Sequence, residues 1–202
     1  ELTTLEETAE FLKRYTEKKN LPLFTSCCPA WVKTAETFYP EKLSNVSTCR
    51  SPQQMYGSVM VHNYTELKGI DRDKLYVVSV MPCTAKKFEA NRPEFSHDGH
   101  QDIDAVITTT ELAEMIKTAG INFDELEDDN FDIPFGFATG AGTIFGYTGG
   151  VATAVVRQAK FLLAGVRDTN EFEMTSHPDF PGLITSDIPI PGDAVVHLAF
   201  VS

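Results

Sequence analysis

Apolar and polar residues are arranged along the chain in a pattern that predicts helices separated by short strands. Helices are expected over the opening residues and over 30–38, 51–67, 111–119 and 151–164. Strands are expected over 21–25, 75–81, 104–108 and 194–201, where short apolar runs are bounded by polar residues. Strands that alternate with helices are typical of an α/β fold, with a mostly parallel sheet flanked by helices.

Two helix starts carry capping sequences. Thr4 and Glu7 have the spacing of a capping box. Ser51, Pro52 and Gln54 predict a second start, with serine as the cap and proline in the first turn. The apolar stripe of the first helix is expected to consist of Leu5, Ala9 and Leu12. Further along, residues 135–150 are rich in glycine, and a loop with several prolines is expected before the last strand.

The four cysteines give the most specific indication of a functional site. Cys27 and Cys28 follow the first expected strand, and Cys83 follows the second, whereas Cys49 lies between them. Because ligand sites in open α/β sheets gather beyond the carboxyl ends of strands, thiols from two loops can meet at one edge. Four cysteines are too few for a disulfide scaffold and indicate a reduced compartment or a metal centre. The alternative is that they are free cysteines buried as small apolar residues.

Charge and hydropathy exclude some partners. The chain has 202 residues and a formal net charge of −12, which argues against nucleic acid as a partner. No apolar run reaches the roughly 18 residues that a membrane span needs.

Two segments around the cysteines resemble a known family. Thr25-Ser-Cys-Cys-Pro-Ala-Trp31 and Met81-Pro-Cys-Thr-Ala-Lys-Lys-Phe-Glu89 are similar to the first two signature motifs of [FeFe]-hydrogenases, TSCCPxW and MPCxxKxxE. Ser47-Thr-Cys-Arg-Ser-Pro-Gln-Gln-Met55 and the glycine-rich segment 135–151 resemble two further family segments. The resemblance implies that residues 1–202 are the central part of the domain that carries the H-cluster.

The family's cofactor and reaction are specific. The H-cluster is a [4Fe–4S] cube joined through a cysteine sulfur to a di-iron unit that carries CO, cyanide and a bridging dithiolate amine. The reaction implied is 2H⁺ + 2e⁻ ⇌ H₂. By motif position, Cys28 and Cys83 are the metal ligands in this chain, and Cys49 matches no ligand position. A cube usually takes four thiolates.

The resemblance also implies partners. The family's third motif, ExMxCxxGCxxGG, supplies the two remaining ligands and is absent from these 202 residues. We therefore expect a fragment that is inactive alone and is completed by a C-terminal cysteine motif. N-terminal Fe–S domains or subunits, maturation proteins and an electron carrier such as ferredoxin are the other expected partners. A cytoplasmic location is expected, with the periplasm as the alternative.

A proton path is implied by the same comparison. Cys27 matches the thiol that passes protons to the bridging amine, and Glu10, Glu7 and Ser47 match the family's proton path, with Arg14 at its outer end. Such a relay is expected to use a partly buried acid of raised pKa. The alternative is that Glu7 belongs to a capping box and that Glu10 and Arg14 form an ordinary i,i+4 pair.

Other matched positions are expected to line the cofactor. Lys86 matches a lysine that contacts one cyanide, and Pro52 and Gln53 match positions lining the opposite cyanide, at a helix start that favours negative charge. The remaining expected cofactor-binding residues are Ser51, Met81, Phe145 and Gly146. For these residues a plain helix start, ordinary core packing and a tight turn are the alternatives.

Three competing functions stay open from the sequence. A sensory relative of the same fold and a non-enzymatic Fe–S scaffold protein are the nearest alternatives. A thiol redox protein would use Cys27 and Cys28, but the usual spaced Cys-x-x-Cys arrangement is missing. His97 and His100, with neighbouring aspartates, are expected to belong to a surface loop and not to a metal site.

Overall fold

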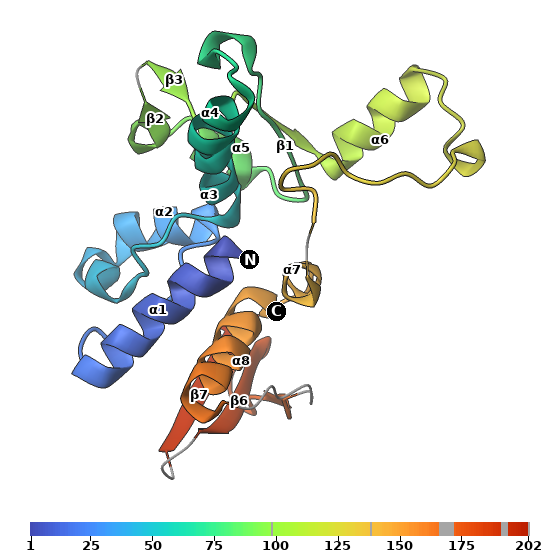
Figure 1. The fold of residues 1–202 in the computed structure, drawn as a ribbon. Coiled ribbons are helices and arrows are strands. Elements are labelled where there is room, and N and C mark those ends of the chain that lie inside the picture. Colours follow the sequence, from blue (N-terminus) through green and yellow to red (C-terminus); the bar gives the residue numbers. More distant parts are fainter. Residues whose placement is uncertain (98, 138, 166–171, 191–193, 202) are drawn as a thin grey trace. The chain divides into compact units, whose positions relative to one another are not determined.

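The computed structural model describes residues 1–97, 99–137, 139–165, 172–190 and 194–201 (Figure 1). The chain divides into two compact units, each with its own buried core. Unit 1 comprises residues 1–25, 44–49 and 138–202, and unit 2 comprises residues 26–43 and 50–137. A 3-10 helix, Pro40–Asn45, contains the position at which the chain passes from unit 2 to unit 1.

Unit 1 combines helices with an antiparallel sheet. Its helices are α1 (Leu2–Glu17), α7 (Gly140–Ile144) and α8 (Gly150–Ala164). Its strands are β5 (Thr175–Ser176), β6 (Leu183–Ile190) and β7 (Ala194–Val201), paired in the order β5-β6-β7. In β6 and β7 the register pairs Leu183 with Val201 and Ile190 with Ala194. The helix α8 packs on β6 and on α1.

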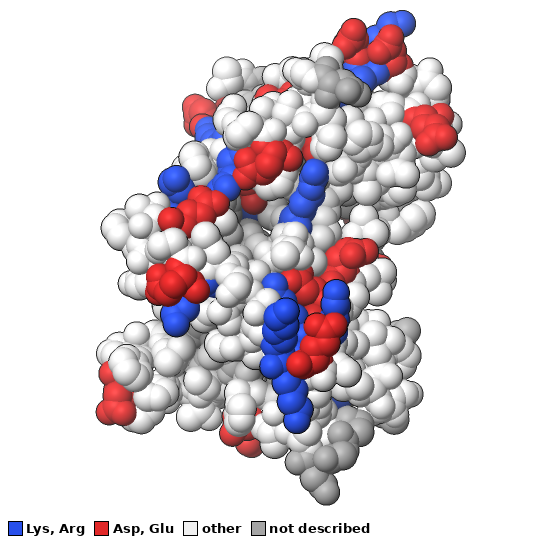
Figure 2. Space-filling view, turned by 90° about the vertical axis from the view of Figure 1, so that its left-hand side faces the viewer, with Lys and Arg blue, Asp and Glu red and all other residues white. Residues whose placement is uncertain are grey.

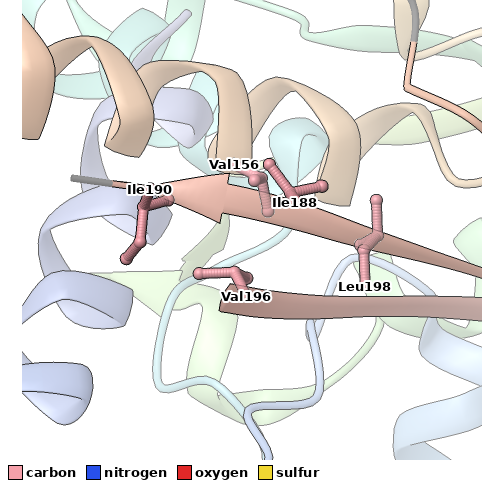
Figure 3. Close-up of a cluster of buried hydrophobic side chains, with 5 residues drawn as sticks. All are labelled: Val156, Ile188, Ile190, Val196 and Leu198. Atoms are coloured by element: carbon pink, nitrogen blue, oxygen red, sulfur yellow. The ribbon is translucent and has the colours of Figure 1, made fainter. Parts of the chain in front are cut away.

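The core of unit 1 lies between α8 and the β6–β7 pair. Alternate residues of each strand point toward the helix, which is why one face of the pair is apolar. The buried cluster consists of Val156 from α8, Ile188 and Ile190 from β6, and Val196 and Leu198 from β7 (Figure 3). Full burial of an aliphatic side chain of this size contributes about 2 kcal/mol.

The fully buried residues of α1 are polar, and the apolar residues of α1 that pack on the core of unit 1 are Phe11 and Tyr15. The predicted apolar stripe is therefore wrong, since Leu5 and Ala9 are exposed. The helix begins at Leu2 without a side-chain cap, so Thr4 and Glu7 form no capping box. The buried residues of α1 are Thr3, Thr4, Glu7, Thr8 and Arg14. Thr8 Oγ1 donates a hydrogen bond to the Val155 carbonyl of α8, at 3.3 Å. A helix face that carries polar groups into the interior is favourable only if they find partners there.

One strand prediction and one loop prediction for unit 1 are wrong. Residues 21–25 form no strand but a single parallel bridge between Phe24 and Val46, and Pro22, which has no N–H, limits any longer ladder. Conversely, β6 lies within the segment expected to be a proline-containing loop. Its Pro189 lies beyond the part of β6 that β5 covers, where a missing N–H is tolerated. Residues 166–171 and 191–193 of that segment fall outside the described residues.

Unit 2 holds the remaining elements. Its α-helices are α2 (Pro29–Phe38), α3 (Pro52–Val59), α4 (Thr65–Lys68), α5 (Ala85–Ala90) and α6 (Thr109–Thr118), and a π-helical turn, Met60–Tyr64, joins α3 to α4. Its strands are β1 (Val78–Met81), β2 (Ser96–His97), β3 (His100–Gln101) and β4 (Ala105–Thr108). Short 3-10 helices occur at Arg72–Lys74, Pro93–Phe95 and Phe123–Glu125.

The α/β class is confirmed by a parallel strand pair in unit 2. The strands β1 and β4 pair in parallel, with Val78 opposite Ala105 and Met81 opposite Thr108, while β2 and β3 form an antiparallel pair. The helices α5 and α6 pack against β4. A second buried cluster, formed by Val61, Val77, Ala90 and Ile103, supports this pair.

The sequence predicted helix boundaries more accurately than it predicted strands. Ser51 caps α3 through its side chain, which accepts a hydrogen bond from the Gln54 amide, and Pro52 occupies the first turn, as predicted. Gly165 ends α8 in the left-handed region, with φ of 70°. The expected helices at 30–38, 111–119 and 151–164 are likewise present, with boundary shifts of one or two residues.

Basic side chains lie beside acidic ones on the face drawn in Figure 2. Ion pairs among the described residues include Arg92 with Glu36 and Lys87 with Glu111. Among the described helices, none has the length and apolar character that a membrane span requires.

Candidate active site

The first cysteine motif lies where an irregular segment enters α2 of unit 2. Cys28 is the N-cap residue of α2, with extended backbone, and Pro29 takes the first helical position. The Cys28 carbonyl accepts the first intrahelical hydrogen bond, from the Val32 amide at 3.0 Å. Cys28 is exposed and Cys27 is half-buried, and neither is in a disulfide. A thiol on the N-cap residue lies near the positive end of the helix dipole, which favours a thiolate or a metal-bound sulfur.

The second motif links β1 to α5 in the same unit. Cys83 lies two residues after β1 and is half-buried with a free thiol. Its carbonyl accepts a hydrogen bond from the Lys86 amide at 3.4 Å, which begins the turn of α5. The helix α5 packs against α2, so the helices that follow Cys28 and Cys83 are direct neighbours.

Lys86 joins the two cysteine motifs. Its Nζ donates a hydrogen bond to the Cys27 carbonyl at 2.7 Å, across 59 residues of sequence. A second bond runs from Nζ to Glu89 Oε2 at 3.1 Å. The lysine side chain is 10% exposed and Glu89 is 5% exposed, so the ion pair is well shielded from water. An ammonium has three donors, and these two bonds leave one for a further acceptor.

Glu89 is the centre of a buried polar network. Its Oε2 accepts hydrogen bonds from Ser51 Oγ at 2.8 Å and from Gln53 Nε2 at 3.2 Å, besides the one from Lys86. Gln53 Nε2 also lies 3.2 Å from the Lys86 carbonyl, and its Oε1 accepts from Ser79 Oγ at 2.8 Å. The start of α3 is thereby tied to α5 and to β1.

In unit 2 these hydrogen bonds and positions describe the surroundings of four expected cofactor-binding residues. The Gln53 amide is 2% exposed and is engaged at both its nitrogen and its oxygen, so its side chain positions Lys86 and Glu89. Ser51 is both the cap of α3 and a donor to Glu89. Pro52 and Met81 are half-buried at the start of α3 and the end of β1.

A second cluster of expected site residues forms in unit 1 around Glu10. One of its oxygens accepts from Arg14 Nη2 at 2.5 Å, and the other accepts from Ser47 Oγ at 3.0 Å. The Thr48 amide and hydroxyl each donate to Oε2 at 3.0 Å. Cys49 Sγ completes the set of donors, 3.4 Å from Oε2.

Arg14 is a fixed part of this cluster and not a mobile surface residue. Its guanidinium also donates to the carbonyls of Asn20, Ser44, Asn45 and Val46, at 3.0–3.2 Å. The Glu10–Arg14 pair is therefore more than an ordinary i,i+4 contact on a helix surface, because the arginine fastens α1 to residues 44–46.

The pKa of Glu10 differs from the expectation of a raised acid. Burial alone would raise it, but the hydrogen bonds from Thr48, Ser47 and Arg14 outweigh burial and lower the pKa below its usual range. Glu10 is therefore a carboxylate at neutral pH and an acceptor of the surrounding hydrogen bonds. The prediction of a raised pKa is wrong for this residue because the sequence does not reveal how many donors residues 47–49 supply.

Glu7 and Cys49 lie beside Glu10. Glu7 is 1% exposed, and a carboxylate oxygen from each glutamate and Cys49 Sγ all lie within 4.8 Å of one another. Burial is the largest effect on the Cys49 thiol, and together with the charges of the two glutamates it raises the pKa of Cys49 to about 12. Cys49 therefore stays protonated.

The glycine-rich segment supplies the remaining expected residues. Phe145 caps the end of α7 and is half-buried, whereas Gly146 is exposed in the turn before α8. Gly149 has φ of 74°, and a Cβ there would lie 2.5 Å from the Phe200 ring, so glycine is required for both reasons. These contacts belong to unit 1 and support the tight-turn interpretation.

The histidines of the β2–β3 hairpin have structural partners. His97 Nδ1 lies 2.7 Å from Asp102 Oδ1, and Arg50 Nη1 donates to Asp102 Oδ2 at 2.7 Å. The rings of His62 and His97 meet edge to face, with centroids 5.0 Å apart. Because both oxygens of the buried Asp102 are engaged, we assign this cluster to the folding of unit 2. Asp98, the other neighbouring aspartate, lies outside the described residues.

Two residues of the clusters received no role from the sequence. Glu89 stands at the end of the second motif, three residues after Lys86, and that helical spacing is the signal that could have paired them. Cys49 follows Ser47 by two residues and matches no ligand position of the family motifs. Only the fold shows that it faces Glu10.

The cysteine loops of unit 2 suit an iron–sulfur ligand set. Cys28 and Cys83 are free thiols that precede helices in mutual contact, and the Lys86 ammonium holds the backbone of one loop to the other. Thiolate sulfur is the donor that iron–sulfur clusters prefer, and a fixed cation nearby favours an anionic group.

Comparison with known proteins gives consistent matches. The family model of the iron-only hydrogenase large subunit, C-terminal domain, matches residues 1–202. Iron hydrogenase 1 of Clostridium pasteurianum is 51% identical over 79% of this chain and 28% of its own length. The periplasmic [Fe] hydrogenase large subunit of Nitratidesulfovibrio vulgaris is 45% identical over 98% of this chain and 48% of its own length. The chain thus spans less than half the length of these relatives.

A solved structure and a more distant relative extend the comparison. The chain is similar to an apo [FeFe]-hydrogenase from Chlamydomonas reinhardtii, with a TM-score of 0.81 and 39% identity over 95% of this chain and 49% of the other. The cytosolic Fe–S cluster assembly factor narfl of Xenopus tropicalis is 32% identical over 96% of this chain and 43% of its own length.

Proposed function

The chain belongs to the iron-only hydrogenase large-subunit family, and on that basis we propose that the protein containing it interconverts protons, electrons and H₂. The central part of the catalytic domain is the role proposed for residues 1–202. Cys28 and Cys83 would bind the [4Fe–4S] cube of an H-cluster, and a third cysteine motif would complete its ligands. When bound, the linked di-iron unit supplies the site at which protons and electrons combine.

The contacts of Lys86 in unit 2 are the observation that supports this proposal most strongly. Its ammonium ties the Cys27 backbone to α5, keeps a third donor for an anionic ligand such as cyanide, and has its charge balanced by buried Glu89. Ser51 and Gln53 hold Glu89 in that position. Pro52, Met81, Phe145 and Gly146 are proposed to line the cofactor, following the family resemblance.

Proton movement is proposed to use Cys27, Glu7, Glu10, Ser47 and Arg14. A thiol such as Cys27 can release and regain a proton because its ordinary pKa is near 8.5. In unit 1 the Glu10 carboxylate accepts from Ser47 Oγ, while Arg14 neutralises its charge. A proton that reaches Glu10 during turnover would be exchanged with Ser47 through the hydrogen bond that already joins them.

Partners follow from the same proposal. An electron carrier such as ferredoxin, additional Fe–S domains or subunits, and maturation proteins would serve the whole hydrogenase. The matches include a periplasmic hydrogenase and a cytosolic assembly factor. We propose the cytoplasm, because four cysteines in 202 residues are too few for a disulfide scaffold.

The test is H₂ turnover by the matured full-length protein. Cys27→Ala is expected to lower turnover at least about 100-fold, because a positioned acid–base group typically contributes that much. Its infrared Fe–CO and Fe–CN bands should persist, since Cys27 is not a proposed ligand. Cys27→Ser is the matched control, which keeps an exchangeable proton with a poorer acid. Undiminished turnover in Cys27→Ala would remove Cys27 from the proton path.

The competing functions give different results. An Fe–S assembly or scaffold protein would show iron–sulfur absorption without Fe–CO bands, and a sensor would show the bands with little turnover. The identities of 45–51% to named hydrogenases, against 32–39% to Fe–S assembly proteins, favour catalysis.

A further inference from the structure

Cys49 lies beside two acids of unit 1, Glu7 and Glu10, at a position to which the family resemblance assigns no role. Its Sγ donates to Glu10 Oε2 at 3.4 Å, which is within range for a sulfur donor. Sγ and one oxygen each of Glu7 and Glu10 lie within 4.8 Å of one another. The thiol is thus a neighbour of both carboxyl groups, which themselves lie one helical turn apart on α1.

The surroundings keep Cys49 in its protonated form. The side chain is half-buried, and burial together with two neighbouring carboxylates disfavours a thiolate. The Cys49 amide donates to Ser47 Oγ at 3.1 Å, which fixes the backbone of the thiol. Cys49 therefore presents a stable S–H group to the Glu10 carboxylate.

Ser47 offers a second exchangeable proton to the same oxygen. Its Oγ lies 3.0 Å from Glu10 Oε2, next to the thiol. The hydroxyl and the thiol are thus two donors set in parallel against one acceptor. Loss of either one leaves the other in place.

We propose that Cys49 transfers protons between Glu7 and Glu10, in parallel with Ser47. The proposal rests on the function proposed above, because it assigns a further residue to that proton path. For transfer from Glu7 to Glu10, a proton leaves the Glu7 carboxyl group for Sγ, while the proton originally on Sγ moves to Glu10 Oε2. Transfer from Glu10 to Glu7 is the reverse of this step. One O–H and one S–H bond break and one of each forms. The thiol is regenerated, the total charge of the three groups is unchanged and no thiolate accumulates.

The test uses the matured full-length hydrogenase with four variants: Cys49→Val, Cys49→Ser, Ser47→Ala, and Ser47→Ala combined with Cys49→Val. Valine removes the proton at similar volume, and serine retains one. Cys49→Val is expected to lower turnover about 3–10-fold, part of the usual contribution of an acid–base group. Cys49→Ser should stay within about twofold of wild type.

The combined variant distinguishes a relay from a packing effect. In each single variant the remaining donor can still carry protons. In the combined variant neither donor is left, so the fold-loss in turnover should exceed the product of the two single fold-losses. A combined loss equal to that product, or wild-type turnover in Cys49→Val at every pH, would overturn the proposal.

A readout independent of turnover is the infrared S–H stretching band of Cys49, isolated as the difference between wild type and Cys49→Val. The band should shift to higher frequency in Glu10→Ala, because the hydrogen bond to the carboxylate is lost. An unshifted band would refute the hydrogen bond between Cys49 and Glu10 on which the proposal rests. This measurement can be made on protein with or without the cofactor. Missing Fe–CO bands in wild type would instead refute the proposed function, and the S–H measurement would still decide on the contact.

Discussion

Individual side chains in both clusters owe their properties to neighbours that are distant in sequence. The motifs predicted that Glu10, Ser47 and Arg14 act together, and the structure places them within hydrogen-bond distance. They did not predict the lowered pKa of Glu10, because Thr48 contributes two donors through an amide and a hydroxyl whose orientation only the fold determines.

The lowered pKa of Glu10 makes stability depend on pH. A carboxyl group whose pKa is lower in the folded than in the unfolded state stabilises the fold above its unfolded pKa. That contribution is lost as the pH falls through the folded pKa. Glu10→Gln is therefore expected to lower the free energy of unfolding by about 2 kcal/mol at pH 7. The difference from wild type should shrink in acid below the ordinary carboxyl range.

Urea unfolding of both proteins at several pH values measures this effect. A difference between wild type and Glu10→Gln that is constant down to the most acidic pH would show that the carboxylate charge is not what stabilises the cluster.

Adjacent lysines provide a matched comparison. Lys86 pairs with Glu89 in the interior, whereas Lys87 pairs with Glu111 at the surface, where the two side chains are 40% and 48% exposed. Lys86→Met should cost about 3 kcal/mol because it leaves a buried carboxylate unpaired. Lys87→Met should cost less than about 1 kcal/mol. Equal urea midpoints for the two variants would contradict the assigned burial of the Lys86 pair.

Secondary-structure elements were predictable where their signals are local. Ser51, Pro52 and Gly165 mark helix ends by their own backbone and side-chain chemistry, and all three do so in the structure. Residues 21–25 and 183–190 were predicted wrongly, because strand formation depends on a partner that the local sequence does not identify. The polar face of α1 was missed for the same reason, since α8 and residues 44–49 supply its partners.

The junction before α8 should be sensitive to substitution. Gly149→Ala adds a methyl group 2.5 Å from the Phe200 ring at a positive φ, so we expect a loss of about 2–4 kcal/mol and a lower Tm. Gly165→Ala is the control, because it also has a positive φ but no atom lies within 4 Å of the added Cβ. Its loss should be about 1 kcal/mol. A Tm for Gly149→Ala at or above that of the control would contradict the packing of Phe200.

The molecule as a whole consists of two compact units that carry different parts of the proposed chemistry. Unit 2 contributes the cysteine motifs and the Lys86–Glu89 network, and unit 1 contributes the Glu7–Glu10 cluster. The family was predictable because its motifs concentrate the chemistry in short segments. The polar networks that support those motifs were not, because each joins elements separated by tens of residues.

Infrared spectroscopy of the full-length protein after maturation shows whether Cys28 and Cys83 are needed to hold an H-cluster. Fe–CO and Fe–CN bands should appear in wild type and should be lost in both Cys28→Ala and Cys83→Ala, since each removes a sulfur from the proposed ligand set. A matured wild type without these bands, or bands that survive both substitutions, would contradict the account.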